Sequence, residues 1–227
     1  MRDRLVGVRR ALTEAPADAV VECLAEALDK EYGVTGVELL QVDYRLAALL
    51  PLGGDEPLTG AGHPAWRCFD HQVEVSQDGV TYLPVTTRGE RTGVLRLSCP
   101  PGDAERGREL AEVAALLGHE LAAVRAGTDR YTVASRTRRL TLAAETQWDL
   151  LPGRNRIRPS FSLAGQLEPA YAVRGDSFDW SDDGERLAPG WRWPTRRPLP
   201  TRRSTPITGA PSTSPSCCWS WICGPGW

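Results

Sequence analysis

The sequence has almost no lysine, no long apolar run and no CxxC motif. Lysine supplies one of the 27 basic residues and arginine the other 26, a ratio typical of a GC-rich bacterial gene. No run of about 18 apolar residues occurs, which predicts that the chain neither spans nor binds a membrane. Residues 1–15 lack the continuous apolar core of a secretory signal, and Cys23, Cys68 and Cys99 are scattered, so we expect a cytoplasmic protein with reduced thiols.

Acidic residues are absent from the last part of the chain. Residues 1–187 hold all 29 acidic residues and 22 of the 27 basic ones, a net charge of -7, whereas residues 188–227 hold five arginines and no acid. The same segment has eight of the 18 prolines, five of the eight tryptophans and three of the six cysteines. Cys217, Cys218 and Cys223 lack the spacing of a structural zinc site, and no histidine accompanies them.

The arginine pairs of this tail, Arg196-Arg197 and Arg202-Arg203, carry the charge that nonspecific nucleic-acid binding needs. Five charges on a predicted disordered tail do not give specific base readout, so we predict no nucleic-acid partner. The surrounding RRPLPTRR also resembles a proline-rich peptide ligand.

Hydrophobic periodicity predicts an α+β domain in the first half of the chain. Helices are expected over 2–12, from Pro16 to a stop at Gly33, over 64–71, and after Asp103 as N-cap. Strands are expected over 37–44, 46–52, 73–75, 81–87 and 94–97, with turns at Gln77-Asp78-Gly79 and Arg88-Gly89-Glu90. The last helix places apolar residues at spacings of three and four: Leu110, Val113, Leu117, Leu121 and Val124.

This order of elements resembles a GAF domain over residues 1–126, with a PAS-like sensor as the main competitor. The resemblance lies in element order and size. It implies a small-molecule or protein-interaction sensor built on one antiparallel sheet with flanking helices. It does not identify a cofactor or ligand for the sensor. A signalling helix over 127–151 is expected to follow. Such helices commonly dimerise in the proteins it resembles, so the resemblance implies a homodimer formed through this linker helix.

The segment HPAWRCFDHQ groups histidine and cysteine, the types of side chain that bind metals or attach tetrapyrroles. His63 and His71 flank Cys68. GAF domains of the phytochrome type place histidine directly after the attaching cysteine, whereas Phe69 follows Cys68 here. We therefore interpret these residues as structural or surface residues.

Residues 141–180 carry the most specific pattern in the sequence. The order A-E-x-Q-x-x-L-L-P, spacer, apolar strand and P-A-x-x-V-x-G-D-x-F-D-W resembles the start of the metal-dependent (PPM-type) serine/threonine phosphatases. More narrowly, it resembles their bacterial sporulation-stage-II-E (SpoIIE-like) branch, which often follows a sensor domain. The matching residues are Ala144-Glu145, Gln147, Leu150-Leu151-Pro152, Pro169-Ala170, Val173, Gly175-Asp176 and Phe178-Asp179.

The resemblance implies a pair of Mn²⁺ or Mg²⁺ ions that activate a water for attack on a phosphoserine or phosphothreonine. It assigns Asp176 as a metal ligand and places Asp179 at a position that is commonly acidic. The family's D-G-x-G motif, whose aspartate bridges both metals, has no counterpart after Leu187. The site is therefore predicted to be incomplete over 152–187, no catalytic residue is assigned, and whether the chain is an enzyme stays open.

Two functions are consistent with these patterns. The first is a sensor-regulated protein phosphatase, incomplete in this chain, whose partner is a phosphorylated regulatory protein such as an anti-sigma-factor antagonist. The second is a non-enzymatic GAF sensor or dimerisation module.

The composition changes abruptly at about Ala188, which predicts that residues 188–227 are an out-of-frame, disordered tail. GC-rich codons for an apolar strand ending in aspartate, read out of register, yield residues of the kind found here. An ordinary disordered tail is the alternative, and its five tryptophans argue against it, because disordered segments have few aromatic residues.

Overall fold

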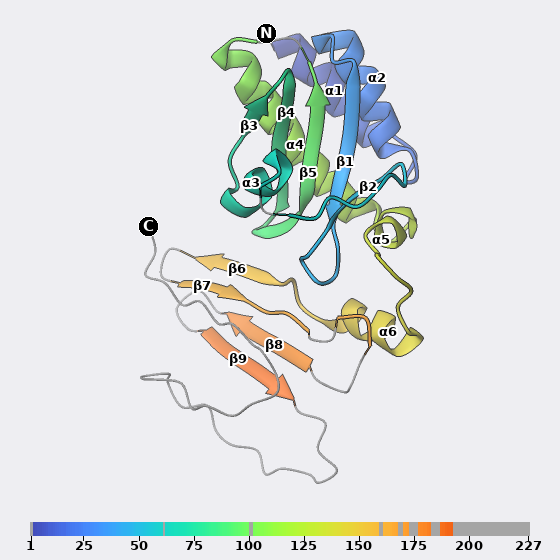
Figure 1. Cartoon of the computed structure of the whole chain (residues 1–227), viewed down its shortest axis with the longest axis vertical. Coiled ribbons are helices and arrows are strands. Elements are labelled where there is room, and N and C mark those ends of the chain that lie inside the picture. Colours follow the sequence, from blue (N-terminus) through green and yellow to red (C-terminus); the bar gives the residue numbers. More distant parts are fainter. Residues whose placement is uncertain are drawn as a thin grey trace. The chain divides into compact units, whose positions relative to one another are not determined.

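The computed structural model describes residues 2–60, 62–99, 102–158, 161–167, 170–172, 177–182 and 187–192. The chain forms two compact units, Met1–Thr137 (unit 1) and Arg138–Trp227 (unit 2). Figure 1 colours the chain by residue number, from blue at the N-terminus of unit 1 to orange in the strands of unit 2. The predictions for Asp176 and for the tail after Arg192 lie outside the described residues. The predicted boundary at residue 126 stays a prediction, since compactness alone places the end of unit 1 at Thr137.

Unit 1 is built on one antiparallel sheet of five strands in the order β2-β1-β5-β4-β3 (Figure 1). The strands are β1 (Gly36–Val42), β2 (Leu49–Pro51), β3 (Val75–Gln77), β4 (Val80–Thr87) and β5 (Glu90–Ser98). The sheet with flanking helices confirms the predicted fold class of this half of the chain.

Two tight turns set the register of the β3–β4 and β4–β5 hairpins. Asp78 and Gly79 have φ of 52° and 75°, and Arg88 and Gly89 have φ of 53° and 89°. Two successive residues with positive φ give a turn whose twist matches that of the flanking strands, and aspartate and glycine tolerate this backbone best. Both turns lie where the sequence predicts them.

The helices of unit 1 are α1 (Arg2–Glu14), α2 (Val20–Tyr32), α3 (Pro64–His71), α4 (Ala104–Val124) and α5 (Arg130–Ala134). The helix expected from Pro16 begins four residues later, because the Ala19 N–H donates to the Pro16 carbonyl and closes a turn first. Gly33 ends α2 in the left-handed conformation at φ 64°. Asp103 caps α4, its side chain accepting from the Arg106 N–H over 2.9 Å.

The two faces of the sheet carry separate apolar cores. On the helix face, α1, α2 and α4 pack over alternate strand residues that include Leu39, Leu83 and Leu95. On the outer face, α3 packs over the other set, which includes Leu40, Tyr82 and Val94. In Figure 1 the three long helices lie behind the sheet and α3 lies in front of it. The strands are thus covered on both sides, although the short α3 covers less of its face.

The predicted signalling helix over 127–151 is two short helices, α5 and α6 (Leu142–Leu150). Residues 135–141 between them are not helical. Thr141 begins α6 as an N-cap, its hydroxyl accepting from the Ala144 N–H over 3.2 Å. A threonine followed by a cap bond starts a new helix rather than continuing an old one, so one uninterrupted linker helix does not form.

Unit 2 contains α6 and two antiparallel hairpins. They pair β6 (Asn155–Arg158) with β7 (Phe161–Ala164) and β8 (Ser177–Asp182) with β9 (Leu187–Arg192). Residues 188–192, predicted to begin the disordered tail, therefore form most of a strand, because they pair with β8. The Trp148 indole N–H donates to the Ala170 carbonyl over 2.7 Å, and the Arg154 guanidinium lies 4.7 Å from the Trp148 ring centroid. These contacts hold α6 to the segments that follow it.

No helix within the described residues is both long and apolar enough to cross a membrane.

Candidate functional site

A row of polar and aromatic side chains crosses the outer face of the unit 1 sheet beside α3. Strand pairing places Glu38 of β1 opposite Arg96 of β5, and Arg96 opposite Tyr82 of β4. Three strands thus contribute one residue each to a single cross-strand row, which we call the polar row. Because paired residues of antiparallel strands point to the same side, all three side chains lie on the outer face.

Glu38 and Arg96 form an ion pair within the polar row. Arg96 Nη1 donates to Glu38 Oε2 over 2.9 Å, and the side chains are 42% (Arg96) and 24% (Glu38) exposed. The bond to Glu38 raises the pKa of the Arg96 guanidinium, to which Tyr82 also contributes. A guanidinium has five N–H donors and a carboxylate two acceptor oxygens, so this pair keeps hydrogen-bonding capacity toward solvent.

His63 closes one side of the polar row. Its Nδ1 accepts from the Ala65 N–H over 3.1 Å and so caps α3, directly before Pro64 at the first helical position. Its ring meets the Tyr82 ring edge-on, with centroids 5.9 Å apart and planes at 85°. His63 therefore joins α3 to the row, with Nδ1 in the acceptor state.

Beneath α3 the outer face is filled by apolar side chains. Cys68 is fully buried, and Trp66 and Phe69 are 6% and 4% exposed with their rings edge to face. Burial, with a smaller contribution from Glu74, raises the pKa of the Cys68 thiol to about 12. A thiol in this state is not a nucleophile or an attachment site, because the thiolate is the reactive form.

Side-chain bonds to backbone carbonyls fix α3 and the segment before it. The Trp66 indole N–H donates to the Leu58 carbonyl over 3.0 Å, and Arg91 Nη1 donates to the Asp70 carbonyl at the other end of α3 over 3.1 Å. His71 lies exposed in the last turn. His63, Cys68 and His71 thus lie in three different environments: His63 caps α3, Cys68 is buried in the core and His71 is on the surface.

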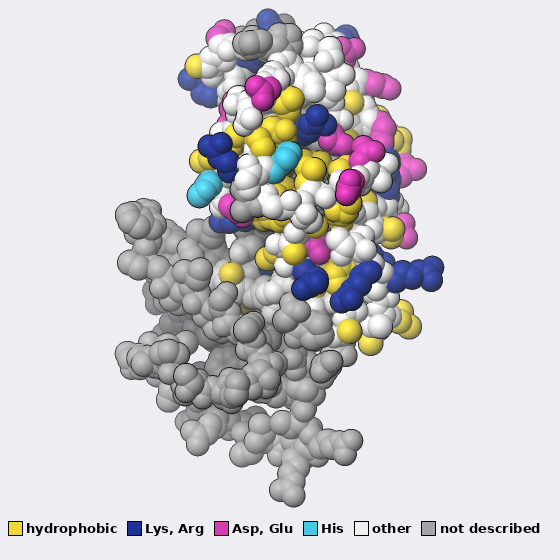
Figure 2. Space-filling view, viewed as in Figure 1, with side chains coloured by type: hydrophobic (Ala, Val, Ile, Leu, Met, Phe, Trp, Pro, Cys, Tyr) yellow, Lys and Arg dark blue, Asp and Glu magenta, His cyan; other side chains and the backbone are white. Residues whose placement is uncertain are grey.

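The chemistry available at the polar row is binding rather than covalent catalysis. It offers the Arg96 cation, the Glu38 anion, the Tyr82 phenol and the His63 imidazole beside apolar side chains. Figure 2 shows basic, acidic, histidine and hydrophobic side chains close to one another on this face of the molecule. Pockets that recognise small molecules combine apolar surface with a few placed polar groups. The row has that composition.

The phosphatase-like residues of unit 2 give no metal site in the described part of the chain. Asp179 lies exposed on β8, and its Oδ1 accepts from the Trp180 N–H over 2.8 Å. Among the residues that the structure describes, no three histidine, cysteine or acidic side chains are close enough to hold an ion. Asp176, which the resemblance assigns as a metal ligand, lies outside the described residues, so the predicted Mn²⁺ or Mg²⁺ site stays a prediction.

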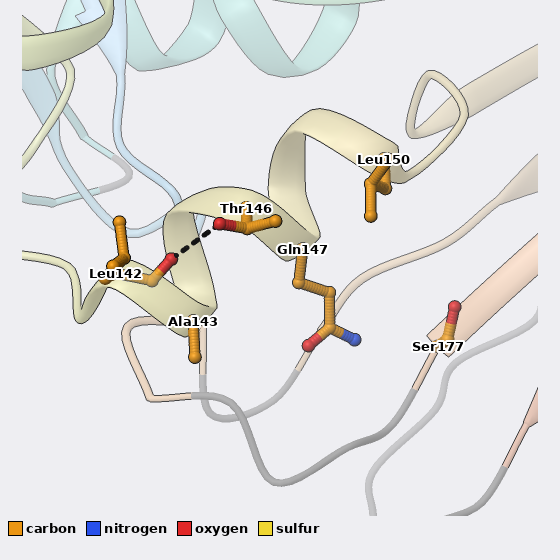
Figure 3. Close-up of a pocket in the computed structure, with 6 residues that line it drawn as sticks. All are labelled: Leu142, Ala143, Thr146, Gln147, Leu150 and Ser177. Atoms are coloured by element: carbon orange, nitrogen blue, oxygen red, sulfur yellow. Dashed lines mark hydrogen bonds between the residues drawn. The ribbon is translucent and has the colours of Figure 1, made fainter.

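An open groove of about 590 Å³ runs along α6 (Figure 3). Leu142 and Leu150, each 80% exposed, lie along it with Thr146 between them. The Thr146 hydroxyl donates to the Leu142 carbonyl over 3.0 Å. The groove is lined by apolar and neutral polar side chains, none of which is an ionisable acid or base: Leu142, Ala143, Thr146, Gln147, Leu150 and Ser177.

Sequence reasoning missed the polar row. Glu38 and Arg96 are 58 positions apart, and only the pairing of β1 with β5 brings them together. The usable signal was a charged residue, Glu38 or Arg96, between two apolar residues of its strand. A charge in that position must be paired or partly exposed, which marks it as worth attention.

Solved structures share the fold of unit 1. The GAF domain of a phosphoenolpyruvate-protein phosphotransferase from Coxiella burnetii matches 56% of this chain and 95% of its own, with 14% identity and a TM-score of 0.50. The corresponding Acinetobacter domain gives the same coverage and identity with a TM-score of 0.48. The GAF domain of the potassium sensor histidine kinase KdpD from Escherichia coli covers 56% and 96%, at 18% identity and a TM-score of 0.43.

The likeness to the Coxiella domain establishes a GAF fold over about half of the chain. No family model matches the sequence. No curated protein matches it either.

Proposed function

We propose that unit 1 is a GAF-type sensor that binds a small polar molecule on its outer face, at the polar row. The observation that carries the proposal is the Glu38–Arg96 pair, a partly exposed ion pair on the sheet face against which α3 packs. A surface ion pair contributes little to stability. Its place beside Tyr82 and His63 is better explained by recognition.

The chemistry of the pair favours a zwitterionic ligand such as a free α-amino acid. The open donors of Arg96 suit a carboxylate, and the oxygens of Glu38 suit an ammonium group. A simple anion would meet the Glu38 carboxylate and a simple cation would meet Arg96. Ligands that carry both charges a few ångströms apart satisfy both side chains together.

Thermal unfolding of the full chain with each standard amino acid tests this proposal. A ligand present at about 100 times its Kd stabilises the folded state by about 2.7 kcal/mol, which raises the Tm by several degrees. We expect such a shift for at least one amino acid, lost in Arg96→Gln. Arg108→Gln, an exposed arginine on α4, is the control and should keep the shift. If no amino acid shifts the wild-type Tm, the ligand class is wrong.

As the finer function we propose a sensor-regulated, metal-dependent serine/threonine phosphatase. Support comes from the sequence pattern of residues 144–179 and from the helix and hairpins that unit 2 forms along it. The substrate would be a phosphorylated regulatory protein such as an anti-sigma-factor antagonist, in the cytoplasm. Because the sequence after Leu187 has no counterpart of the family's D-G-x-G motif, we propose that this chain itself carries the sensor function.

Hydrolysis of a phosphoserine peptide by the full chain with added Mn²⁺ distinguishes a phosphatase from a non-enzymatic sensor module. Metal-dependent turnover that is lost in Asp176→Asn and retained in Asp55→Asn, an exposed unit 1 residue, would assign the phosphatase activity to this chain. We expect no turnover above the metal alone, in agreement with a non-enzymatic sensor module.

A further inference from the structure

The short helix α5 is fastened to the start of α2. Tyr131 is 5% exposed, and its hydroxyl oxygen accepts a hydrogen bond from the Val20 backbone N–H over 3.1 Å. The two residues are 111 positions apart. Burial raises the pKa of the Tyr131 phenol, so the hydroxyl stays neutral.

This contact supplies what α2 lacks. The first N–H groups of a helix have no partner within it and are usually capped by a nearby side chain. The N-cap residue of α2 is Ala19, which makes no side-chain cap bond. Tyr131 of α5, which lies 111 positions later in the sequence, accepts the hydrogen bond that a local cap residue would usually accept.

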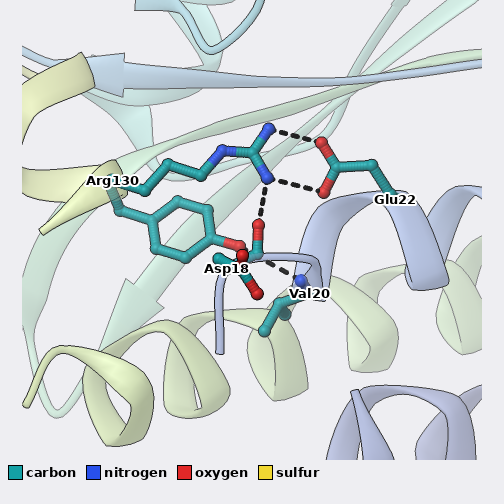
Figure 4. Close-up of polar contacts among 5 residues, drawn as sticks. Asp18, Val20, Glu22 and Arg130 are labelled. Carbon is teal, nitrogen blue, oxygen red and sulfur yellow. Dashed lines mark hydrogen bonds and ion pairs between the residues drawn. The ribbon is translucent and has the colours of Figure 1, made fainter. Parts of the chain in front are cut away.

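Beside this hydrogen bond, Arg130 contacts the Glu22 carboxylate and the Asp18 carbonyl, an arrangement that we call the clamp (Figure 4). Arg130 Nη1 lies 3.0 Å from Glu22 Oε2, and Nη2 bonds the second Glu22 oxygen. Nη1 also donates to the Asp18 carbonyl. The clamp lowers the pKa of the Glu22 carboxyl and raises that of Arg130, each through the bond to the other. A two-pronged arginine–carboxylate pair fixes orientation as well as distance.

The clamp lies where the chain leaves unit 1. After α4 ends, Gly127 passes so close to Ala17 that a Cβ on this glycine would lie 3.4 Å from the alanine Cβ. The helix α5 follows, and the non-helical residues 135–141 then lead into unit 2. The position of α5 therefore sets where this connection begins.

We propose that Arg130 and Tyr131 form a latch that ties the outgoing chain to the α2 N-terminus, so that a shift of α2 is passed to residues 135–141. The contacts above support the latch itself. Its role in signalling rests on the proposed sensor function. Val21, Leu24 and Leu28 of α2 belong to the helix-face core that also contains strand residues, which links the latch to the sheet. Coupling of this kind is reciprocal: loosening either side must loosen the other.

Amide hydrogen exchange of the full chain tests the latch without any ligand. Tyr131→Phe keeps the ring and removes the acceptor, and we expect about five- to tenfold faster exchange at the first turn of α2 and at residues 128–136. Glu22→Gln, a surface change on α2, should speed exchange at 128–136 although it lies in another part of the sequence. Arg9→Gln breaks a similarly exposed pair with Glu112 and should change neither region.

Exchanging the charges of residues 22 and 130 provides a second test of the latch. Glu22→Arg combined with Arg130→Glu should restore part of the protection at 128–136 that either single change removes. Unchanged exchange in Glu22→Gln, or equal acceleration throughout unit 1, would overturn the latch. Neither outcome depends on which molecule binds the polar row, so failure of the sensor proposal and failure of the latch are distinguishable.

Discussion

Gly118 of α4 lies directly against Thr87 of β4: a Cβ built on this glycine would be 2.7 Å from the threonine hydroxyl oxygen and 3.1 Å from the Thr86 carbonyl oxygen. Alanine at a helix position normally stabilises by about 1 kcal/mol relative to glycine. Here the backbone of β4 cannot retreat without disturbing the sheet, so the clash should dominate. We predict that Gly118→Ala destabilises the full chain by about 1–3 kcal/mol in urea unfolding.

Gly107 on the same helix provides the control for this prediction. A Cβ there would meet only Glu74 Oε2 at 3.6 Å, an ordinary contact. Gly107→Ala should therefore leave stability unchanged or raise it by up to about 1 kcal/mol. If both alanine variants have the same unfolding midpoint, the close packing of α4 against β4 is not what requires glycine at Gly118.

The raised thiol pKa of Cys68 predicts selective resistance to alkylation. With a pKa of about 12, the thiolate fraction at pH 8 is about 10⁻⁴, and the side chain is fully buried. Cys99, which is only partly buried, should react with iodoacetamide at least about tenfold faster than Cys68 in the native protein. Peptide mapping by mass spectrometry gives both rates. Equal rates in native protein, rather than only after unfolding, would show that α3 does not protect Cys68.

The Glu22–Arg130 pair predicts the direction of a pH effect. The bond to Arg130 holds the folded-state pKa of Glu22 below its ordinary value of 4.5. A carboxyl group with a lowered folded pKa stabilises the fold above its unfolded pKa, and this contribution disappears as the pH falls through the folded value. The Tm of wild type should exceed that of Glu22→Gln at pH 7 by a small margin, since the pair is partly exposed. The difference should shrink as the pH falls below 4.5 and the Glu22 carboxyl becomes protonated, and a difference that grows on acidification would contradict the pairing.

The buried position of Tyr131 predicts a difference between two truncated chains. A fragment ending at residue 126 lacks this side chain, which belongs to the helix-face core, whereas one ending at residue 137 keeps it. Removing a buried aromatic side chain costs about 3–5 kcal/mol. We expect residues 1–137 to require clearly more urea for unfolding than residues 1–126. Coincident unfolding curves would place α5 outside the cooperative unit.

Local features of unit 1 were predictable because their causes are local. Pro64 at a first helical position marks the start of α3, Gly33 the end of α2, and Asp103 the cap of α4. The Asp78-Gly79 turn follows from the positive φ that these residues tolerate. Element order then sufficed to predict the GAF-like fold.

The candidate site was not predictable in the same way, because its contacts join distant segments. The polar row depends on β5 lying between β1 and β4, which periodicity does not reveal. The His63 cap is not a serine, threonine, asparagine or aspartate, the residues that the usual capping pattern detects. The Tyr131 cap of α2 comes from 111 positions away. Each requires the tertiary structure.

The central claim is that unit 1 senses a small zwitterionic molecule at the polar row, and its most direct test is the location of binding. Proton–nitrogen NMR spectra of the labelled full chain should be recorded during titration with each standard amino acid. The account predicts saturable shifts at Glu38, Tyr82 and Arg96 and at the start of α3, with the helix face unaffected and the shifts abolished in Arg96→Gln. Saturable shifts confined to the helix face or to unit 2, or none with any amino acid, would contradict it.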